Sequence, residues 1–91
     1  MVTVESFREL VGKDVFTDRG LYCGRVADLD LDIERFRVRG ILIDVARGSY
    51  LAKFVGAKKG VVVPFHIVQS IGDIVIIKSI SVPSELKEES E

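Results

Sequence analysis

The side chains best suited to chemistry in this sequence form an acidic series with a carboxylate at every second position. Asp28, Asp30 and Asp32 alternate with aliphatic residues. The spacing superficially matches a calcium-binding loop, but such a loop needs Gly at its sixth position and Glu at its twelfth. This chain has Ile33 and Arg39 there. The alternation instead predicts a half-buried strand with its carboxylates in water and its aliphatic side chains toward the core.

The two side chains that most often act as nucleophile or base both lack a partner in the sequence. Cys23 is the single cysteine and His66 the single histidine, and no further group stands at metal-ligand or catalytic spacing from either. Cys23 is expected to be a small buried apolar group. We therefore predict that the protein is not an enzyme and uses no metal and no cofactor.

Lysines gather in a glycine-containing stretch, residues 46–60, which predicts a loop with at most a short turn of structure. Lys53, Lys58 and Lys59 form this candidate basic loop. Its spacing differs from that of a phosphate-binding loop, and no aromatic residues interleave with the lysines as RNA-stacking surfaces require. The formal net charge is -1, so no overall field draws the domain onto nucleic acid. Nucleic acid is a disfavoured partner, and RNA or ribosome association through these lysines is the alternative.

The length of 91 residues predicts one small domain. Its core must come from Val, Ile and Leu, because aromatic residues make up 8% of the chain and Trp is absent. That composition favours strands. A lone cysteine suits a reducing compartment, and the sequence shows neither a secretory signal nor an apolar run of about 20 residues. We expect a cytoplasmic protein with no direct membrane insertion.

The elements that would position these groups follow from periodicity and turn residues. Residues 4–11 have helical spacing, and a strand at 13–17 should turn at 17–20, closed by Gly20 in the left-handed region. After the acidic strand, a four-residue loop at 33–36 should set Asp30 opposite Arg39 and Asp32 opposite Arg37. The phase of the alternation then changes, and Gly40 is the expected bulge or sharp bend.

The C-terminal third should supply two more strands and a tail. Val61 to Val63 form a short buried strand before Pro64, and Gly72 and Asp73 predict a two-residue hairpin turn. Residues 83–91 are acidic and are expected to be disordered.

The last strand is apolar on both faces, which predicts a homodimer because a small barrel has one interior and its other side needs cover. The N-terminal helix could supply that cover instead. The candidate self-association residues are Ile74, Val75, Ile76, Ile77, Ile80 and Val82.

The order and spacing of several short segments resemble the PRC-barrel family. The likeness covers roughly residues 5–78 and is carried by segments 11–15, 18–20, 24–29, 63–64 and 71–76. It implies a mostly β fold, a small PRC-type barrel with a short N-terminal helix at residues 1–82, followed by the acidic tail at 83–91.

The family includes the cytoplasmic domain of the photosynthetic reaction centre H subunit, the C-terminal domain of the ribosome maturation factor RimM, and small free-standing proteins common in archaea. Some of the last group are linked to FtsZ-based division through the anchoring protein SepF. The chain has neither the transmembrane helix of the H subunit nor the first barrel of RimM, so it resembles the free-standing class. The resemblance implies a non-catalytic protein-binding adaptor with a SepF-like partner, recruited to the division site through that partner, and it supplies no catalytic residues.

Overall fold

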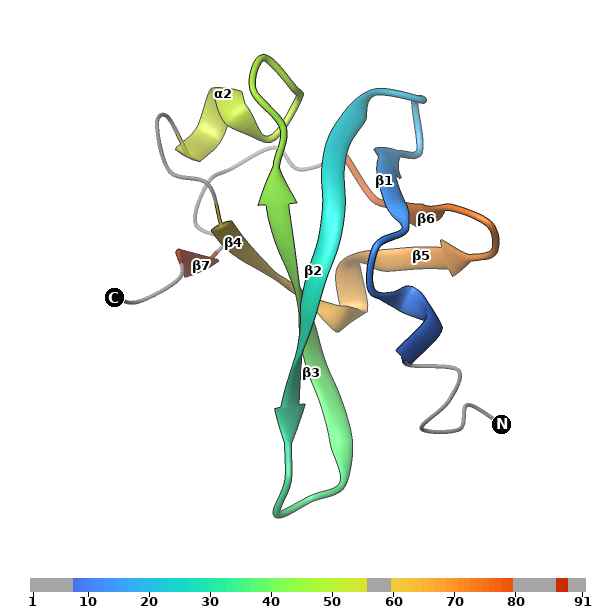
Figure 1. Ribbon diagram of the computed structural model, residues 1–91, viewed down its shortest axis with the longest axis vertical. Coiled ribbons are helices and arrows are strands. Elements are labelled where there is room, and N and C mark those ends of the chain that lie inside the picture. The colour runs from blue at the N-terminus through green and yellow to red at the C-terminus, as the bar shows by residue number, and fades with distance from the viewer. Residues whose placement is uncertain (1–7, 56–59, 80–86, 89–91) are drawn as a thin grey trace.

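One strongly curved sheet of seven strands organises the chain (Figure 1). The structure, a computed structural model, describes residues 8–55, 60–79 and 87–88. The strand order is β5-β6-β1-β2-β3-β4-β7, and neighbouring strands are antiparallel except for the parallel pair β1 and β6. The strands are β1 (Asp14–Thr17), β2 (Tyr22–Asp32), β3 (Arg37–Val45), β4 (Gly60–Pro64), β5 (Val68–Ile71), β6 (Val75–Ile77) and β7 (Lys87–Glu88).

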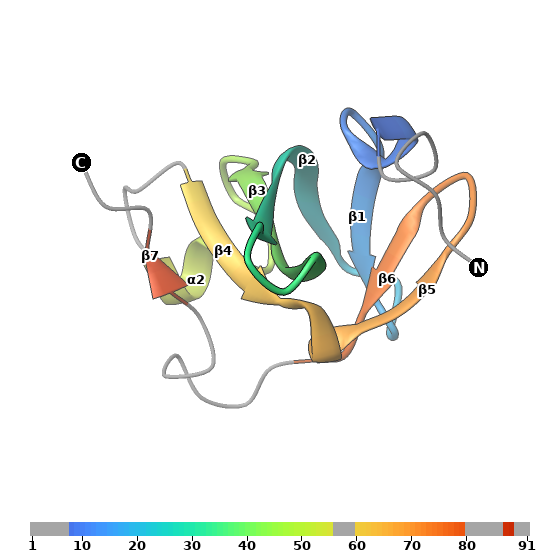
Figure 2. The same cartoon turned by 90° about the horizontal axis from the view of Figure 1, so that it is seen from below.

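The sheet curls into a barrel-like shape that its ladders leave open. After β4, the short 3₁₀ helix η1 (Phe65–Ile67) carries the chain back beneath the sheet to β5 (Figure 2). Lys78 N donates to Ile67 O at 2.9 Å and ties this connection to the end of β6. Among the described residues no ladder joins β5 to β4 or β7. The predicted mostly β class, with a short helix and a small barrel-type sheet, is confirmed.

Aliphatic side chains on the concave face of the sheet build the core, as the composition predicted. Alternation places one residue in two on this face of each strand. Helical residues 8–10 add Leu10, and the short helix α2 (Ala52–Val55) adds its last residue. The buried hydrophobic residues are Leu10, Val15, Cys23, Val26, Ile41, Ile43, Leu51, Val55, Val61, Val63, Ile67, Val75 and Ile77.

The predicted turn between β1 and β2 is confirmed. Gly20 has φ +82°, and its N–H donates to Thr17 O at 2.9 Å. Thr17 is buried, and its Oγ1 accepts from the N–H groups of Arg19 and Leu21 at 3.2 and 3.1 Å. The start of the predicted helix at 4–11 lies outside the described residues, but the helix ends before Gly12, which has φ +93°.

The β2–β3 hairpin has the predicted four-residue loop at 33–36 and one departure in register. Asp32 pairs with Arg37 as predicted. Asp30, however, pairs with Gly40 and not with Arg39, because the register shifts between Asp30 and Leu31. Arg39 is the extra residue of a bulge, so the predicted irregularity lies directly beside Gly40.

The predicted two-residue turn at Gly72 and Asp73 is wrong. Ile71 pairs with Val75, which leaves residues 72–74 as the connection, and Gly72 N donates to Ile74 O at 2.9 Å. The parallel ladder that pairs Val75 with Val15 fixes this register, since both side chains are buried. Core packing therefore overrides the local turn preference.

Two segments expected to be irregular contain short elements. The 46–60 loop holds α2, in agreement with the short turn of structure predicted there. The tail was expected to be disordered, yet Lys87–Glu88 form β7 along β4, with Glu88 opposite Val61. The edge of β4 offers unpaired N–H and C=O groups, which a passing strand can pair. The other tail residues lie outside the described ones.

Candidate interaction surface

The end of the β2–β3 hairpin, residues 29–38, extends beyond the rest of the sheet and is called the arm here (Figure 1). The register of β1 along β2 reaches Arg25, and that of β4 along β3 begins at Gly40. Between these limits β2 and β3 pair with each other alone among the described strands. The arm is therefore a two-stranded ribbon whose outer edges keep backbone groups available for hydrogen bonds.

Large apolar side chains of the arm are in water. Leu31 is 44% exposed, Ile33 69% and Phe36 91%. The alternation of the acidic strand had predicted that its aliphatic side chains would face the core, and this is wrong beyond Leu29. Leu29 packs against the core, but the arm runs past the body that would have covered the next two.

Phe36 also has an unusual backbone conformation for a bulky residue. Its φ is +53°, the only positive value at a non-glycine among the described residues. The left-handed region costs an L-residue roughly 1 to 2 kcal/mol. The ring is 91% exposed, so side-chain packing does not offset that cost. The loop therefore holds an aromatic ring in solvent at the expense of local stability.

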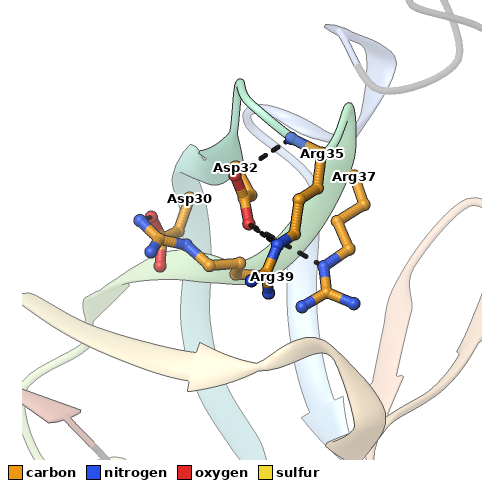
Figure 3. A network of polar contacts seen from close by, with 5 residues as sticks. All are labelled: Asp30, Asp32, Arg35, Arg37 and Arg39. Carbon is orange, nitrogen blue, oxygen red and sulfur yellow. Dashed lines mark hydrogen bonds and ion pairs between the residues drawn. The ribbon is translucent and has the colours of Figure 1, made fainter.

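Charged side chains form a network along the arm (Figure 3). Arg39 Nη2 lies 2.9 Å from Asp30 Oδ1. Asp32 Oδ2 lies 3.9 Å from Arg37 Nε and 4.0 Å from Arg35 Nε, and Asp32 Oδ1 accepts from Arg35 N at 3.2 Å. The arginines are more than half exposed, so each pair contributes only about 0.2 to 1 kcal/mol. Over residues 30–39 three acidic side chains balance three arginines, which leaves little net positive charge for a phosphate backbone.

Gly40 holds the base of the arm against β4. A Cβ at this position would lie 2.5 Å from Val63 O and 3.2 Å from Val62 Cγ1. The close approach of the two backbones requires glycine here, in agreement with the predicted role of Gly40 at the bend. Because β4 is itself buried in the sheet, this contact fixes the direction in which the arm leaves the body.

The structure describes one lysine of the predicted basic loop. Lys53 lies on α2, while Lys58 and Lys59 lie outside the described residues. Lys53 lines a shallow surface depression of about 250 Å³ at the end of the molecule opposite to the arm tip. Sequence reasoning missed this depression, because its lining comes from segments far apart in the chain.

The structure divides the predicted self-association strand into two faces. Val75 and Ile77 are 1% and 0% exposed and belong to the core, so neither can lie at an interface. Ile74 is 39% exposed and Ile76 is partly buried. Ile80 and Val82 lie outside the described residues. Among the four candidates that the structure describes, alternation thus leaves Ile74 and Ile76 available on the outer side.

The side chains considered for catalysis are not assembled into a site. Cys23 is buried, and this desolvation raises the pKa of its thiol from 9.0 to about 12, which suppresses the nucleophilic thiolate. His66 is exposed on η1. In the part of the chain that the structure describes, no three metal-ligating side chains gather. None of the helices among those same residues has the length and apolarity to cross a bilayer.

Comparison with known proteins agrees with this geometry. No curated protein matches the sequence closely. The sequence matches the PRC-barrel domain family over residues 3–82, which span the curved sheet from before β1 to beyond β6. The match covers most of the chain, and the observed mostly β sheet with its short helices is consistent with such a barrel. The chain therefore belongs to the PRC-barrel domain family.

Proposed function

We propose that this PRC-barrel domain is a non-catalytic adaptor that binds a partner protein through the arm. The observation that carries the proposal is the exposure of Ile33 and Phe36 on a ribbon that extends away from the core. Large apolar side chains held in solvent are typical of protein contacts, where aromatic anchors contribute much of the binding energy.

The partner proposed is a protein with an apolar groove that receives Phe36 and the neighbouring Ile33. The free edge of the arm adds a second mode of contact, because an extended segment of the partner can pair with the backbone of β2 beyond Ala27. The matched charges around Asp32 favour a partner contact of low net charge. Following the resemblance to free-standing archaeal PRC-barrel proteins, we propose a SepF-like division protein as this partner and the cytoplasm as the setting.

Self-association is a separate part of the proposal and uses another surface. The registers place Ile76 beside Phe16 on β1, and Phe16 beside Tyr22 on β2, with the two aromatic ring centroids 5.2 Å apart. Ile76 and Phe16 are partly buried and Tyr22 is 38% exposed. These three side chains form an apolar row across β6, β1 and β2. In a homodimer the rows of the two copies would meet across a two-fold axis, the commonest symmetry of small oligomers.

RNA or ribosome association is the alternative function. Arg47 and Lys53 beside the surface depression are the described cations that favour it. Affinity for RNA measured across a salt series separates the two functions, because phosphate-driven binding weakens steeply as salt rises.

Comparative capture from native lysate tests the adaptor function. Wild type, Phe36→Ser and Val11→Ser are immobilised in equal amounts, and retained proteins are quantified by mass spectrometry. Val11 is 48% exposed but lies outside the arm and does not line the depression, so it is the matched control. We expect a set of proteins that wild type and Val11→Ser retain and Phe36→Ser loses. Equal retention by all three would reject the arm as the binding surface.

A further inference from the structure

A shallow depression lies at the end of the molecule opposite to the arm tip, where the turn that leads from β3 to α2 passes the start of β2 (Figure 1). Its volume is about 250 Å³. It is formed by Leu21 and the first residue of β2, the turn that follows β3, and one residue of α2. The lining residues are Leu21, Tyr22, Arg47, Gly48, Ser49, Tyr50 and Lys53.

Backbone hydrogen bonds hold the walls of the depression together. Tyr50 N donates to Tyr22 O at 2.9 Å, and Ala46 N donates to Cys23 O at 3.1 Å. Gly48 turns the chain with φ +75°, and Leu51, directly after the turn, is fully buried. The site is therefore anchored to the core and formed before any ligand arrives, which lowers the entropic cost of binding.

The two cationic side chains of the depression are available to an anion. Arg47 and Lys53 make no ion pair or hydrogen bond through their side chains within the residues described, unlike the paired arginines of the arm. Both residues are exposed and line the depression.

The aromatic rings of the depression serve as walls. The Tyr22 ring packs on Phe16, and its hydroxyl donates to Asp14 Oδ1 at 3.2 Å. The Tyr50 ring packs edge-on against Phe54, with centroids 5.2 Å apart. Rings committed to these contacts offer less of a platform for stacked bases. Two cations with apolar walls instead suit a carboxylate on an aliphatic stem.

We propose that this depression binds a carboxylate side chain of an acidic peptide segment, with Arg47 and Lys53 as the charged contacts. The proposal rests on the proposed protein-binding function and adds a second contact, at the opposite end of the domain from the arm. A partner that spans both ends would combine an apolar contact at the arm with an acidic segment here, and the two linked contacts would reinforce each other.

The test is a titration of the full chain with an N-acetylated, C-amidated hexaglutamate peptide, followed by amide chemical shifts. The uncharged hexaglutamine peptide is the control ligand. We expect amide chemical shifts to change at residues 46–53 when hexaglutamate is added and to stay unchanged when hexaglutamine is added. Arg47→Gln and Lys53→Gln should each weaken binding by roughly fivefold, the upper range for an exposed ion pair. Arg8→Gln removes the same charge from an exposed helical residue that does not line the depression, and it should leave affinity unchanged.

Three outcomes would overturn the proposal. The first is that Arg47→Gln and Arg8→Gln weaken the binding of hexaglutamate equally, which would show general charge attraction. The second is an absence of shifts at residues 46–53. The third is a decauridylate RNA that binds these residues at least tenfold more tightly than hexaglutamate at the same salt concentration. Phe36→Ser should bind hexaglutamate as wild type does, so failure of the arm and failure of this site are distinguished.

Discussion

Replacing Gly40 with Ala should destabilise the domain because the added methyl group would meet a backbone that cannot move freely. The Cβ would lie 2.5 Å from Val63 O, well inside van der Waals contact. Val63 is fully buried on β4, whose opposite edge pairs with β7. Relief therefore requires β3 and β4 to separate at this point.

The magnitude follows from two costs. Overpacking a tight site costs about 1 to 3 kcal/mol, and weakening one β3–β4 hydrogen bond adds roughly 1 kcal/mol. We expect Gly40→Ala to lower the free energy of unfolding by about 2 to 4 kcal/mol, and Gly40→Val by at least as much. Urea unfolding followed by far-ultraviolet circular dichroism measures the difference.

Gly72→Ala is the matched control for this experiment. No heavy atom lies within 4 Å of a Cβ built at Gly72, and its φ is not positive. The control should be neutral or raise the free energy of unfolding by up to about 1 kcal/mol, through a more restricted unfolded chain. Equal stability of Gly40→Ala and Gly72→Ala would refute the close approach of β3 and β4 and the fixed base of the arm.

Further predictions concern other parts of the molecule. Phe36→Asn should raise the free energy of unfolding by about 0.5 to 1 kcal/mol, because Asn tolerates positive φ better, and a lower urea midpoint would contradict this. Arg39→Gln should change stability by less than about 1 kcal/mol, with the difference from wild type shrinking in 1 M salt; a larger, salt-independent loss would contradict an exposed ion pair. Ile77→Lys should prevent folding, whereas Ile76→Lys should give a folded monomer by sedimentation; a native wild type that sediments as a monomer at high micromolar concentration would reject the homodimer. Because burial raises the pKa of Cys23, ionisation of this thiol leaves stability unchanged below pH 9 and lowers the free energy of unfolding as pH rises from 9 toward about 12. Native protein should therefore resist a thiol reagent at pH 8, and rapid labelling without unfolding would contradict the burial.

Local patterns in the sequence were sufficient where neighbouring residues determine structure. The turn at Gly20 follows from turn chemistry, and the pairing of Asp32 with Arg37 follows from alternation and loop length. The bulge beside Gly40 follows from the change of phase. In each case the deciding interactions lie within about ten residues of each other, where patterns are informative.

The sequence was insufficient where contacts between distant segments determine the structure. Alternation predicts that Leu31 and Ile33 share a face, but it does not predict that β1 and β4 end before they reach these residues. The 72–74 connection is set by a parallel ladder to β1, a contact between distant segments. The left-handed backbone of the hairpin loop falls on Phe36, a residue type that no turn preference assigns to it.

The candidate site shows the same limit. The basic loop was recognised through Lys53, but Tyr22 comes together with it only in the fold. The apolar character of the last strand was recognised, yet the assignment of Val75 to the core needed the observed pairing. Chemistry shared between separate segments carries no periodic signal that a single sequence reveals.

The most direct test of the adaptor account is a titration of the isotope-labelled domain with a purified partner recovered by comparative capture. The account predicts that the largest amide shifts fall on the arm, at residues 29–38, and that Phe36→Ser weakens binding by at least tenfold, as expected for an aromatic hot spot. Val11→Ser should bind as wild type does. Shifts confined to β5 and β6, with equal affinity of Phe36→Ser and wild type, would contradict the account.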